Sequence, residues 1–223
     1  DPALYPILGY LAGHQAGNRV IAFEGLPGKI SLDCLKGLGA AVASSGSVAL
    51  FHVIGVTPEA QNRKMCLKSE NQIRTIRVTP ELLKDMEQQL KTADDDHIDW
   101  IGLGCPHFSF AEFQELSKLL NERRVHPGLK ATVFTSRTIY AWIKELGLLE
   151  QLNAAGFDIY TDGCLLLYPK HMGLTGTMMT NSAKAANYIH SQSGLKAAYA
   201  SLKQCVESAV RGKAVYREAS WLS

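Results

Sequence analysis

The chain has 223 residues, of which 46% are hydrophobic and 20% charged, and its formal net charge is +2. These values are typical of a globular protein with one large or two small domains. Basic residues cluster no further than pairs such as Arg123-Arg124, which argues against a nucleic-acid-binding surface. No apolar stretch approaches the roughly 20 residues that cross a bilayer, and no signal-peptide pattern opens the chain. We therefore expect a cytoplasmic protein that binds neither nucleic acid nor membrane.

Helix and strand patterns alternate in the first ninety residues. Gly9, Gly13 and Gly17 lie four apart in an apolar segment, which predicts a helix over 5–17 with one bare face for close packing. The other expected elements are a strand over 19–24, a helix capped by Ser31, a strand over 47–54, a strand over 75–78, and a helix from the Thr79 cap to Lys91.

The alternation continues to the end of the chain. The expected elements are a strand before Cys105, a helix over 109–124 capped by Ser109 or Phe110, a strand over 130–135, a helix over 137–153 capped by Ser136, a strand before Cys164, a helix after Asn181, and a last helix over 196–211. Such alternation predicts an α/β fold, with a mostly parallel sheet covered by helices on both faces. We expect possible sub-domains at about 1–92 and 93–223.

Five cysteines are scattered along the chain, at positions 34, 66, 105, 164 and 205. An odd, scattered set argues against a disulfide framework. Cys34 and Cys205 lie at helical spacing among apolar residues and are expected in the core, whereas Cys66 carries no local signal. Cys105 and Cys164 each follow a predicted strand, so both thiols are expected at the carboxyl edge of the sheet, where open α/β sheets bind ligands.

The segment Gly104-Cys105-Pro106-His107 allows several interpretations. The Cys105 thiolate could act as a nucleophile or a metal ligand, or the residue could be an inert thiol at a strand end. A nucleophilic pair with His107 has poor geometry, because a base and its nucleophile usually come from separate loops. There is no C-x-x-C pair, which argues against a structural zinc ribbon. An iron–sulfur cluster, in contrast, can recruit cysteines from distant loops.

Other polar residues are candidates for substrate binding. Asn181, Ser182 and Lys184 would give a helix start a hydroxyl and an ammonium, which suits a carboxylate or phosphate; alternatively they are a cap and an exposed lysine. His52, within an apolar run, is either a core histidine or a ligand. Glu59 is either a base in a loop or a carboxylate at the start of a helix.

Several stretches resemble the aconitase X family and occur in the same order. They are Tyr5-Pro-Ile-Leu-Gly-Tyr-Leu-Ala-Gly13, Leu38-Gly-Ala-Ala-Val-Ala-Ser-Ser-Gly46, Leu50-Phe-His-Val-Ile-Gly-Val-Thr-Pro-Glu-Ala60, Leu103-Gly-Cys-Pro-His107, Tyr160-Thr-Asp-Gly-Cys164 and Thr180-Asn-Ser-Ala-Lys-Ala-Ala-Asn-Tyr188. The resemblance implies an aconitase-like catalytic domain. Members of the family are hydro-lyases, including cis-3-hydroxy-L-proline dehydratases and phosphomevalonate dehydratase.

The resemblance also implies a cofactor and partners. An iron–sulfur cluster, or a simpler mononuclear iron centre, would be held by three cysteines, two of which correspond to Cys105 and Cys164. The third cysteine and the small swivelling domain, which contributes a catalytic serine, lie outside the matched stretches. We therefore expect the chain to be the carboxyl-terminal part of a catalytic region that needs its amino-terminal segment and a small domain or subunit.

The expected function is iron-assisted removal of water from a 3-hydroxy acid. We expect cis-3-hydroxy-L-proline as substrate, with phosphomevalonate as the alternative. His107 would assist the departing hydroxyl, while the catalytic pair Ser182 and Lys184, together with Asn181, would hold the anionic group. Substrate-binding roles are also expected for the two remaining polar candidates, His52 and Glu59. An alternative of another class is a non-catalytic α/β binding or scaffold subunit that lacks the cluster.

Overall fold

A computed structural model describes residues 1–67 and 73–216. The strands are β1 (Ile21–Phe23), β2 (Phe51–Val53), β3 (Trp100–Phe108), β4 (Lys130–Thr135), β5 (Asp158–Thr161), β6 (Thr177–Thr180) and β7 (Lys196–Tyr199). The helices are α1 (Leu4–Ala16), α2 (Leu32–Gly46), the 3-10 turn η1 (Pro58–Ala60), α3 (Arg63–Cys66), α4 (Pro80–Gln89), α5 (Phe110–Leu120), α6 (Arg137–Glu145), α7 (Leu148–Ala154), α8 (Tyr168–Met172), α9 (Ala183–Ser193) and α10 (Leu202–Arg211).

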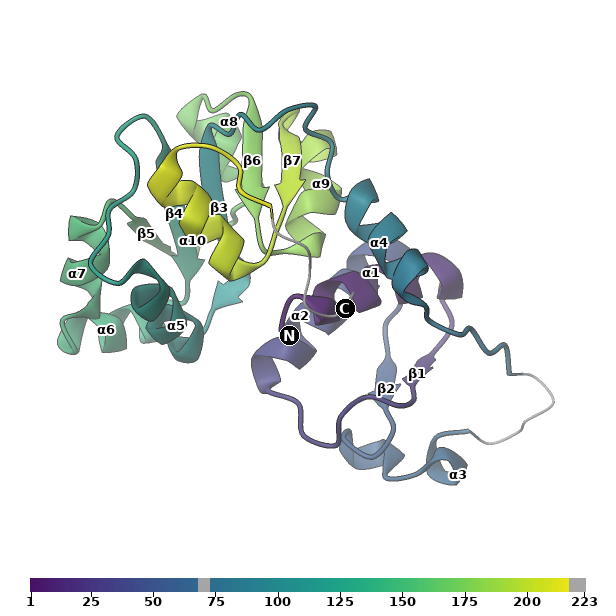
Figure 1. Cartoon of the computed structure of the whole chain (residues 1–223). Helices are drawn as coiled ribbons and strands as arrows, with labels where there is room; N and C mark the ends of the chain where they lie inside the picture. Colours follow the sequence, from purple (N-terminus) through teal and green to yellow (C-terminus); the bar gives the residue numbers. More distant parts are fainter. Residues whose placement is uncertain (68–72, 217–223) are drawn as a thin grey trace.

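Two parallel sheets organise the chain (Figure 1). The larger sheet has five strands in the order β5-β4-β3-β6-β7, and every neighbouring pair in it is parallel. The smaller sheet pairs β1 with β2, also in parallel. This architecture confirms the expected α/β fold with a mostly parallel sheet.

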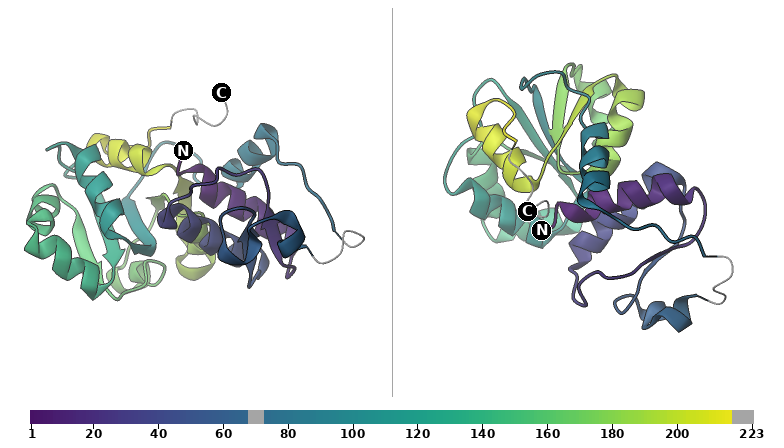
Figure 2. Two further views of the ribbon diagram at one scale, coloured as in Figure 1. Left: turned by 90° about the horizontal axis from the view of Figure 1, so that it is seen from below. Right: turned by 45° about the vertical axis from the view of Figure 1, so that its right-hand side comes forward.

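Alternating side chains of the five-stranded sheet enter two different cores. Ile101, Val133 and Met179 pack in one core with side chains of α5, α7 and α10. Trp100 and Met178, each one residue away along its strand, pack in the other core with side chains of α1, α2 and α9. Successive residues of a strand point to opposite faces, so both faces of this sheet are covered. Figure 2 shows the helices on the two sides.

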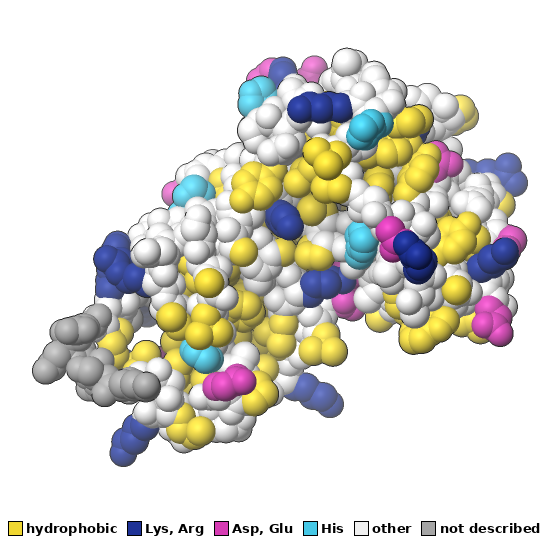
Figure 3. All heavy atoms as spheres, turned by 180° about the vertical axis from the view of Figure 1, so that it is seen from behind, with side chains coloured by type: hydrophobic (Ala, Val, Ile, Leu, Met, Phe, Trp, Pro, Cys, Tyr) yellow, Lys and Arg dark blue, Asp and Glu magenta, His cyan; other side chains and the backbone are white. Residues whose placement is uncertain are grey.

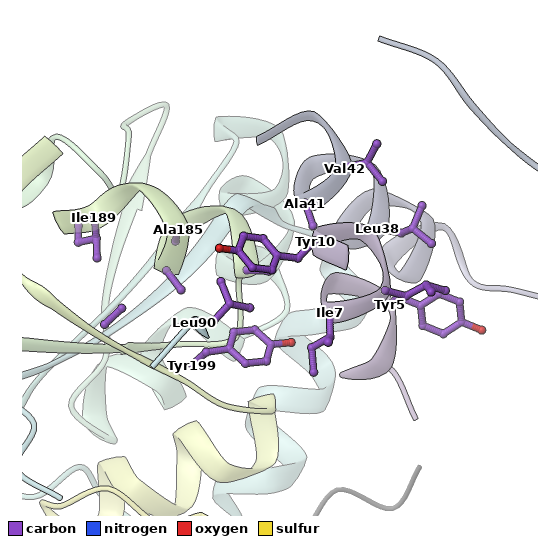
Figure 4. Close-up of a cluster of buried hydrophobic side chains, with 14 of the residues drawn as sticks. Tyr5, Ile7, Tyr10, Leu38, Ala41, Val42, Leu90, Ala185, Ile189 and Tyr199 are labelled. Carbon is purple, nitrogen blue, oxygen red and sulfur yellow. The ribbon is translucent and has the colours of Figure 1, made fainter. Parts of the chain in front are cut away.

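Glycines let α1 and α2 approach each other closely. A Cβ atom on Gly9 would lie 2.4 Å from Leu38 O, and one on Gly13 would lie 2.0 Å from Ser45 Oγ. The expected helix with a bare packing face is therefore confirmed. Figure 4 shows side chains of α1 facing Ala185 of α9, so this helix pair also joins the core of the larger sheet.

The predicted helix starts are confirmed by side-chain caps. The hydroxyls of Ser31, Thr79, Ser109 and Ser136 each accept a hydrogen bond from a backbone N–H of the first helical turn that follows. These four residues mark where α2, α4, α5 and α6 begin, because each cap satisfies a backbone donor that has no partner inside the helix.

Three of the predicted elements are wrong or incomplete. The segment 75–78 is mostly exposed and forms no strand, since no neighbouring strand pairs with it. The predicted helix over 137–153 is two helices, because Gly147 takes a left-handed conformation (φ 72°) between α6 and α7. The predicted helix over 196–211 begins only at Leu202, and its first residues form β7.

The surface is mostly that of an ordinary folded protein. Large hydrophobic side chains are exposed at scattered positions, for example Leu32 and Leu146. Figure 3 shows that hydrophobic side chains are also exposed on the face opposite to that of Figure 1. Among the helices of residues 1–67 and 73–216, none combines the length and apolar character that crossing a bilayer requires.

Candidate metal and substrate site

The candidate residues cluster at the point where the order of the larger sheet reverses. The chain runs from β3 outward to β4 and β5, and then returns to place β6 on the other side of β3. The carboxyl ends of β3 and β6 therefore border a topological switch point, the usual ligand-binding crevice of an open parallel sheet. Cys105 lies near the end of β3, and the Asn181-Ser182 turn follows β6 directly.

A bulge in β3 places Cys105 at this edge. Leu103 pairs with Val133 and Phe108 pairs with Thr135. Five steps along β3 thus match two steps along β4, which leaves three extra residues on β3 between the two pairs. Bulges of this kind bend a strand and re-aim its side chains, often beside active sites. Cys105 belongs to the bulged segment and is half-buried.

Glycine is required immediately before this cysteine. Gly104 has φ 90°, and a Cβ atom there would lie 2.1 Å from Phe134 O on β4. Backbone of β3 and β4 is therefore in close contact below the thiol, as only glycine permits. The Cys105-Pro106 peptide bond that follows is cis.

Cys164 lies in the loop after β5 and is exposed. The residue before it is tied to the β3 bulge, because His107 Nε2–H donates to Gly163 O at 2.9 Å. The loop is also tied to α6, since Arg137 Nε donates to Asp162 Oδ2 at 2.5 Å. The loop that carries Cys164 is thus tied both to the β3 bulge and to the start of α6.

The start of α9 completes the cluster. Ser182 caps this helix by accepting a hydrogen bond from Ala185 N at 3.0 Å, and its side chain is buried. Burial raises the pKa of the Cys105 thiol, whereas the Lys184 ammonium and a hydrogen bond with Ser182 lower it, and the Cys164 thiol adds to the rise. Cys105 therefore interacts electrostatically with three of the predicted site residues.

The other substrate-binding candidates lie elsewhere or at the margin. His52 is on β2, within the smaller sheet (Figure 1), and Glu59 is in η1, which contacts β2. In the described part of the chain, no hydrogen bond or ion pair joins either residue to Cys105 or Lys184, and His52 Nδ1 is buried without a partner. Asn181 is half-buried in the turn between β6 and α9. Their positions thus favour Asn181 over His52 and Glu59 as a substrate-binding candidate.

The donor set matches part of a metal centre. Within residues 1–67 and 73–216, no group of three or more His, Cys, Asp or Glu side chains is arranged to hold a metal ion. Cys105 and Cys164 carry thiols, and thiolates are the soft ligands that iron–sulfur and iron centres take. Of the remaining cysteines, Cys205 is fully buried in the core as expected, and Cys34 is half-buried.

A second polar group near Cys105 has no counterpart in the sequence prediction. Lys36 Nζ, from α2, donates to His107 O at 3.1 Å and to Glu112 Oε2 at 2.5 Å, and also pairs with Asp33. Ser109 Oγ donates to Asp33 Oδ2 at 2.8 Å. This network joins α2 to the end of β3. The hydrogen bonds between the two segments join residues 71 or 76 positions apart in the sequence, so no local pattern predicts them. Asp162, in contrast, stands directly before Gly163-Cys164 in the sequence. Its position beside the motif is a signal from which a site role could be predicted.

Comparisons with known proteins match the chain to two domain models and to named relatives. A family model described as the aconitase X second domain matches residues 1–88, and one described as the aconitase X third domain matches residues 98–211. The cis-3-hydroxy-L-proline dehydratase of Pseudomonas aeruginosa is 39% identical over 226 residues, which cover 100% of this chain and 39% of that protein. The phosphomevalonate dehydratase large subunit of Methanothermobacter thermautotrophicus is 37% identical over 195 residues, 87% of this chain and 47% of that protein.

A solved structure has the same fold. The crystal structure of Thermococcus kodakaraensis aconitase X in its holo-form superposes with a TM-score of 0.81 at 29% identity, over 94% of this chain and 52% of that chain. The chain thus spans between 39% and 52% of the length of these three proteins. With both family models matched in order, the chain belongs to the aconitase X family.

Proposed function

We propose that the complete protein is a hydro-lyase that removes water from cis-3-hydroxy-L-proline. The observation that carries this proposal is the 39% identity to a cis-3-hydroxy-L-proline dehydratase across the whole chain. A second dehydratase of that name, from Hypocrea jecorina, is 35% identical over 216 residues. Phosphomevalonate is the second candidate substrate, supported by the 37% identity to a phosphomevalonate dehydratase large subunit.

In this proposal Cys105 and Cys164 are two ligands of an iron–sulfur or mononuclear iron centre. Such an iron supplies Lewis-acid chemistry when bound, which favours departure of a hydroxyl group. The third thiolate and the small domain or subunit would come from outside the described residues. The name "large subunit" among the relatives supports a small-subunit partner.

The residues around Cys105 would bind the substrate's anionic group. Lys184 carries an ammonium at the second residue of α9, and the helix start adds the partial positive charge of its free backbone N–H groups. Ser182 would orient the Cys105 thiol through its hydrogen bond and keep the helix start in place. Asn181 would add an amide to the same turn. Assistance of the departing hydroxyl by His107 stays a prediction, and the hydrogen bond to Gly163 O also supports a positioning role for this residue.

Several further expectations stay proposals. The division at about 1–92 and 93–223 is supported by the two sheets and by family models that end at residue 88 and begin at residue 98. Substrate contacts of His52 and Glu59, and the cytoplasmic location, stay predictions from the sequence. A non-catalytic scaffold remains the alternative of another class.

The test uses the complete protein, assembled with its small domain or subunit and reconstituted anaerobically with iron and sulfide. Both compounds are assayed under the same conditions. Turnover of cis-3-hydroxy-L-proline above phosphomevalonate is the expected result, and turnover of phosphomevalonate alone would select the second substrate. Turnover of neither compound, with iron bound, would contradict the proposed activity and leave the scaffold alternative.

A further inference from the structure

The position of Cys164 is not set by regular secondary structure. The residue follows β5, precedes α8 and is exposed, so neither a sheet ladder nor a helix fixes its backbone. A thiol in such a loop would sample many positions, which would weaken any site it shares with Cys105. Specific contacts to the segment 162–164 must therefore define where this thiol lies.

The first contact is an ion pair at the start of the loop. Asp162 has φ 51°, an uncommon conformation for a residue other than glycine. Its Oδ1 accepts a hydrogen bond from Arg137 N at 3.3 Å, its Oδ2 accepts one from Arg137 Nε at 2.5 Å, and its own N–H donates to Thr135 O at 3.0 Å. Three contacts thus tie the loop to the junction between β4 and α6.

The second contact comes from the β3 bulge. His107 lies two residues after Cys105, and its Nε2–H donates to Gly163 O at 2.9 Å. The carbonyl of Gly163 belongs to the peptide group that leads into Cys164. This hydrogen bond therefore joins the β3 bulge, which carries Cys105, to the loop segment that carries Cys164.

Aromatic side chains pack against the loop and limit its movement toward the sheet. A Cβ atom on Gly163 would lie 2.9 Å from Phe134 Cε1, so the loop rests directly on that ring. Phe134 is nearly fully buried and stacks on Tyr160 with ring centroids 5.5 Å apart. Tyr168 packs edge-on against Phe134, and its N–H donates to Cys164 O at 3.1 Å. Because the ring cannot move freely, the loop has little room to shift toward the sheet.

We propose that His107 and the Arg137–Asp162 pair are positioning residues, which hold the Gly163-Cys164 segment so that the Cys164 thiol shares a site with Cys105. This inference rests on the proposed function, in which the two thiols are ligands of one metal centre. His107 then acts through the hydrogen bond that it donates to a backbone carbonyl. Polar partners of this kind behind metal ligands typically change metal affinity about 10- to 100-fold when they are removed.

The test measures binding of Zn²⁺ alone by the reduced chain, in competition with a chromophoric chelator. The parent carries Cys34→Ser and Cys66→Ser, and Cys205 is left in place because it is fully buried. His107→Ala, Asp162→Ala and Arg137→Gln are compared with the exposed matched controls His171→Ala and Arg124→Gln. We expect the first three to weaken Zn²⁺ binding about 10- to 100-fold and the controls to leave it unchanged.

His107→Gln separates positioning from acid–base chemistry. A glutamine amide still has an N–H that can reach a carbonyl, but it does not titrate. We expect this variant to recover most of the affinity lost in His107→Ala. Weak Zn²⁺ binding in a folded His107→Gln variant, checked by its thermal melt, would overturn the hydrogen-bond role. Arg137→Gln alters a side chain that is 82% exposed and keeps the test valid if another variant unfolds.

Two further outcomes distinguish this inference from the proposed metal site. If Cys105→Ser and Cys164→Ser abolish Zn²⁺ binding while His107→Ala, Asp162→Ala and Arg137→Gln bind as the parent does, the positioning role is wrong and the metal site stands. If both serine variants bind Zn²⁺ as the parent does, the thiols share no metal site, and both proposals fail.

Discussion

The two sheets differ in what lies at their carboxyl edges. In the five-stranded sheet the strand order reverses between β3 and β6, and Cys105, Ser182 and Lys184 border that reversal. The two-stranded sheet has no reversal, and its candidates His52 and Glu59 make no described contact with the cluster. Strand order therefore decides which strand-end residues meet, while residue type alone does not.

The first part of the chain instead supports the site through packing. Gly13 and Gly46 bring α1 and α2 into backbone contact, and this pair packs against α9. Lys36 of α2 reaches His107 O in the β3 bulge. Four experiments test whether the α1–α2 pair supports the fold while the residues at the edge of the larger sheet carry the chemistry. They begin with the largest expected effect.

Gly13→Val should destabilise the fold most strongly. The new Cβ atom would lie 2.0 Å from Ser45 Oγ and 2.7 Å from Val42 O, so the helices must separate. We expect a loss of about 3 kcal/mol or more in the free energy of unfolding, measured by urea denaturation. The matched control is Gly28→Ala, where a Cβ atom meets nothing within 4 Å and a change of less than about 0.5 kcal/mol is expected. Equal stability of the two variants would contradict the close packing.

Lys36→Met should have the next largest effect, and this effect should depend on pH. Burial raises the pKa of Glu112, and Lys36 lowers it again. Without Lys36 the pKa rises further, so the ionised carboxylate is penalised at pH 7 and the protonated form at low pH is not. We expect a loss of about 1–3 kcal/mol at pH 7 and a smaller loss near pH 4, measured by denaturation at both values. A loss that grows as the pH falls would contradict the pairing.

Ser182→Ala tests a residue that belongs to both packing and site. The variant loses the cap of α9, which should cost about 1 kcal/mol of unfolding free energy. Ser136→Ala removes the equivalent cap of α6 and should cost a similar amount. Only Ser182→Ala should also slow alkylation of Cys105, because its hydroxyl stabilises the thiolate. Equal alkylation rates in the two variants would separate Ser182 from Cys105.

Lys184→Gln should leave the free energy of unfolding nearly unchanged and alter only the pKa of the Cys105 thiol. Lys184 lowers the pKa of Cys105, so its removal raises that pKa. Because the thiolate is the reactive form, the pH midpoint of Cys105 alkylation in the reduced chain should move upward. Mass spectrometry of the Cys105 peptide across a pH series measures this midpoint. An unchanged midpoint would place the ammonium too far from the thiol to act on it.

The sequence predicts the elements that carry strong local signals. The helix caps Ser109 and Ser136 follow apolar strand runs, and both are confirmed. The strands β6 and β7 have four residues each and lack such a run, so the sequence predicts no strand at β6 and a helix at β7. Segment 75–78 shows the converse error, because β-branched residues form a strand only where a neighbour pairs with them.

The site could be predicted as a set of residues but not as a geometry. Cys105 and Cys164 stand out because each follows a strand run, and the topology places both at one edge. The bulge in β3 and the contacts of Arg137 with Asp162 depend on distant segments. No local pattern in the sequence encodes them.

The most direct test of the shared site is a crystal structure of the reduced chain grown with Zn²⁺. We expect one Zn²⁺ ion bonded to both Cys105 Sγ and Cys164 Sγ, at about 2.3 Å from each sulfur. Separate ions on the two cysteines, or sulfurs that face opposite sides of the sheet, would contradict it.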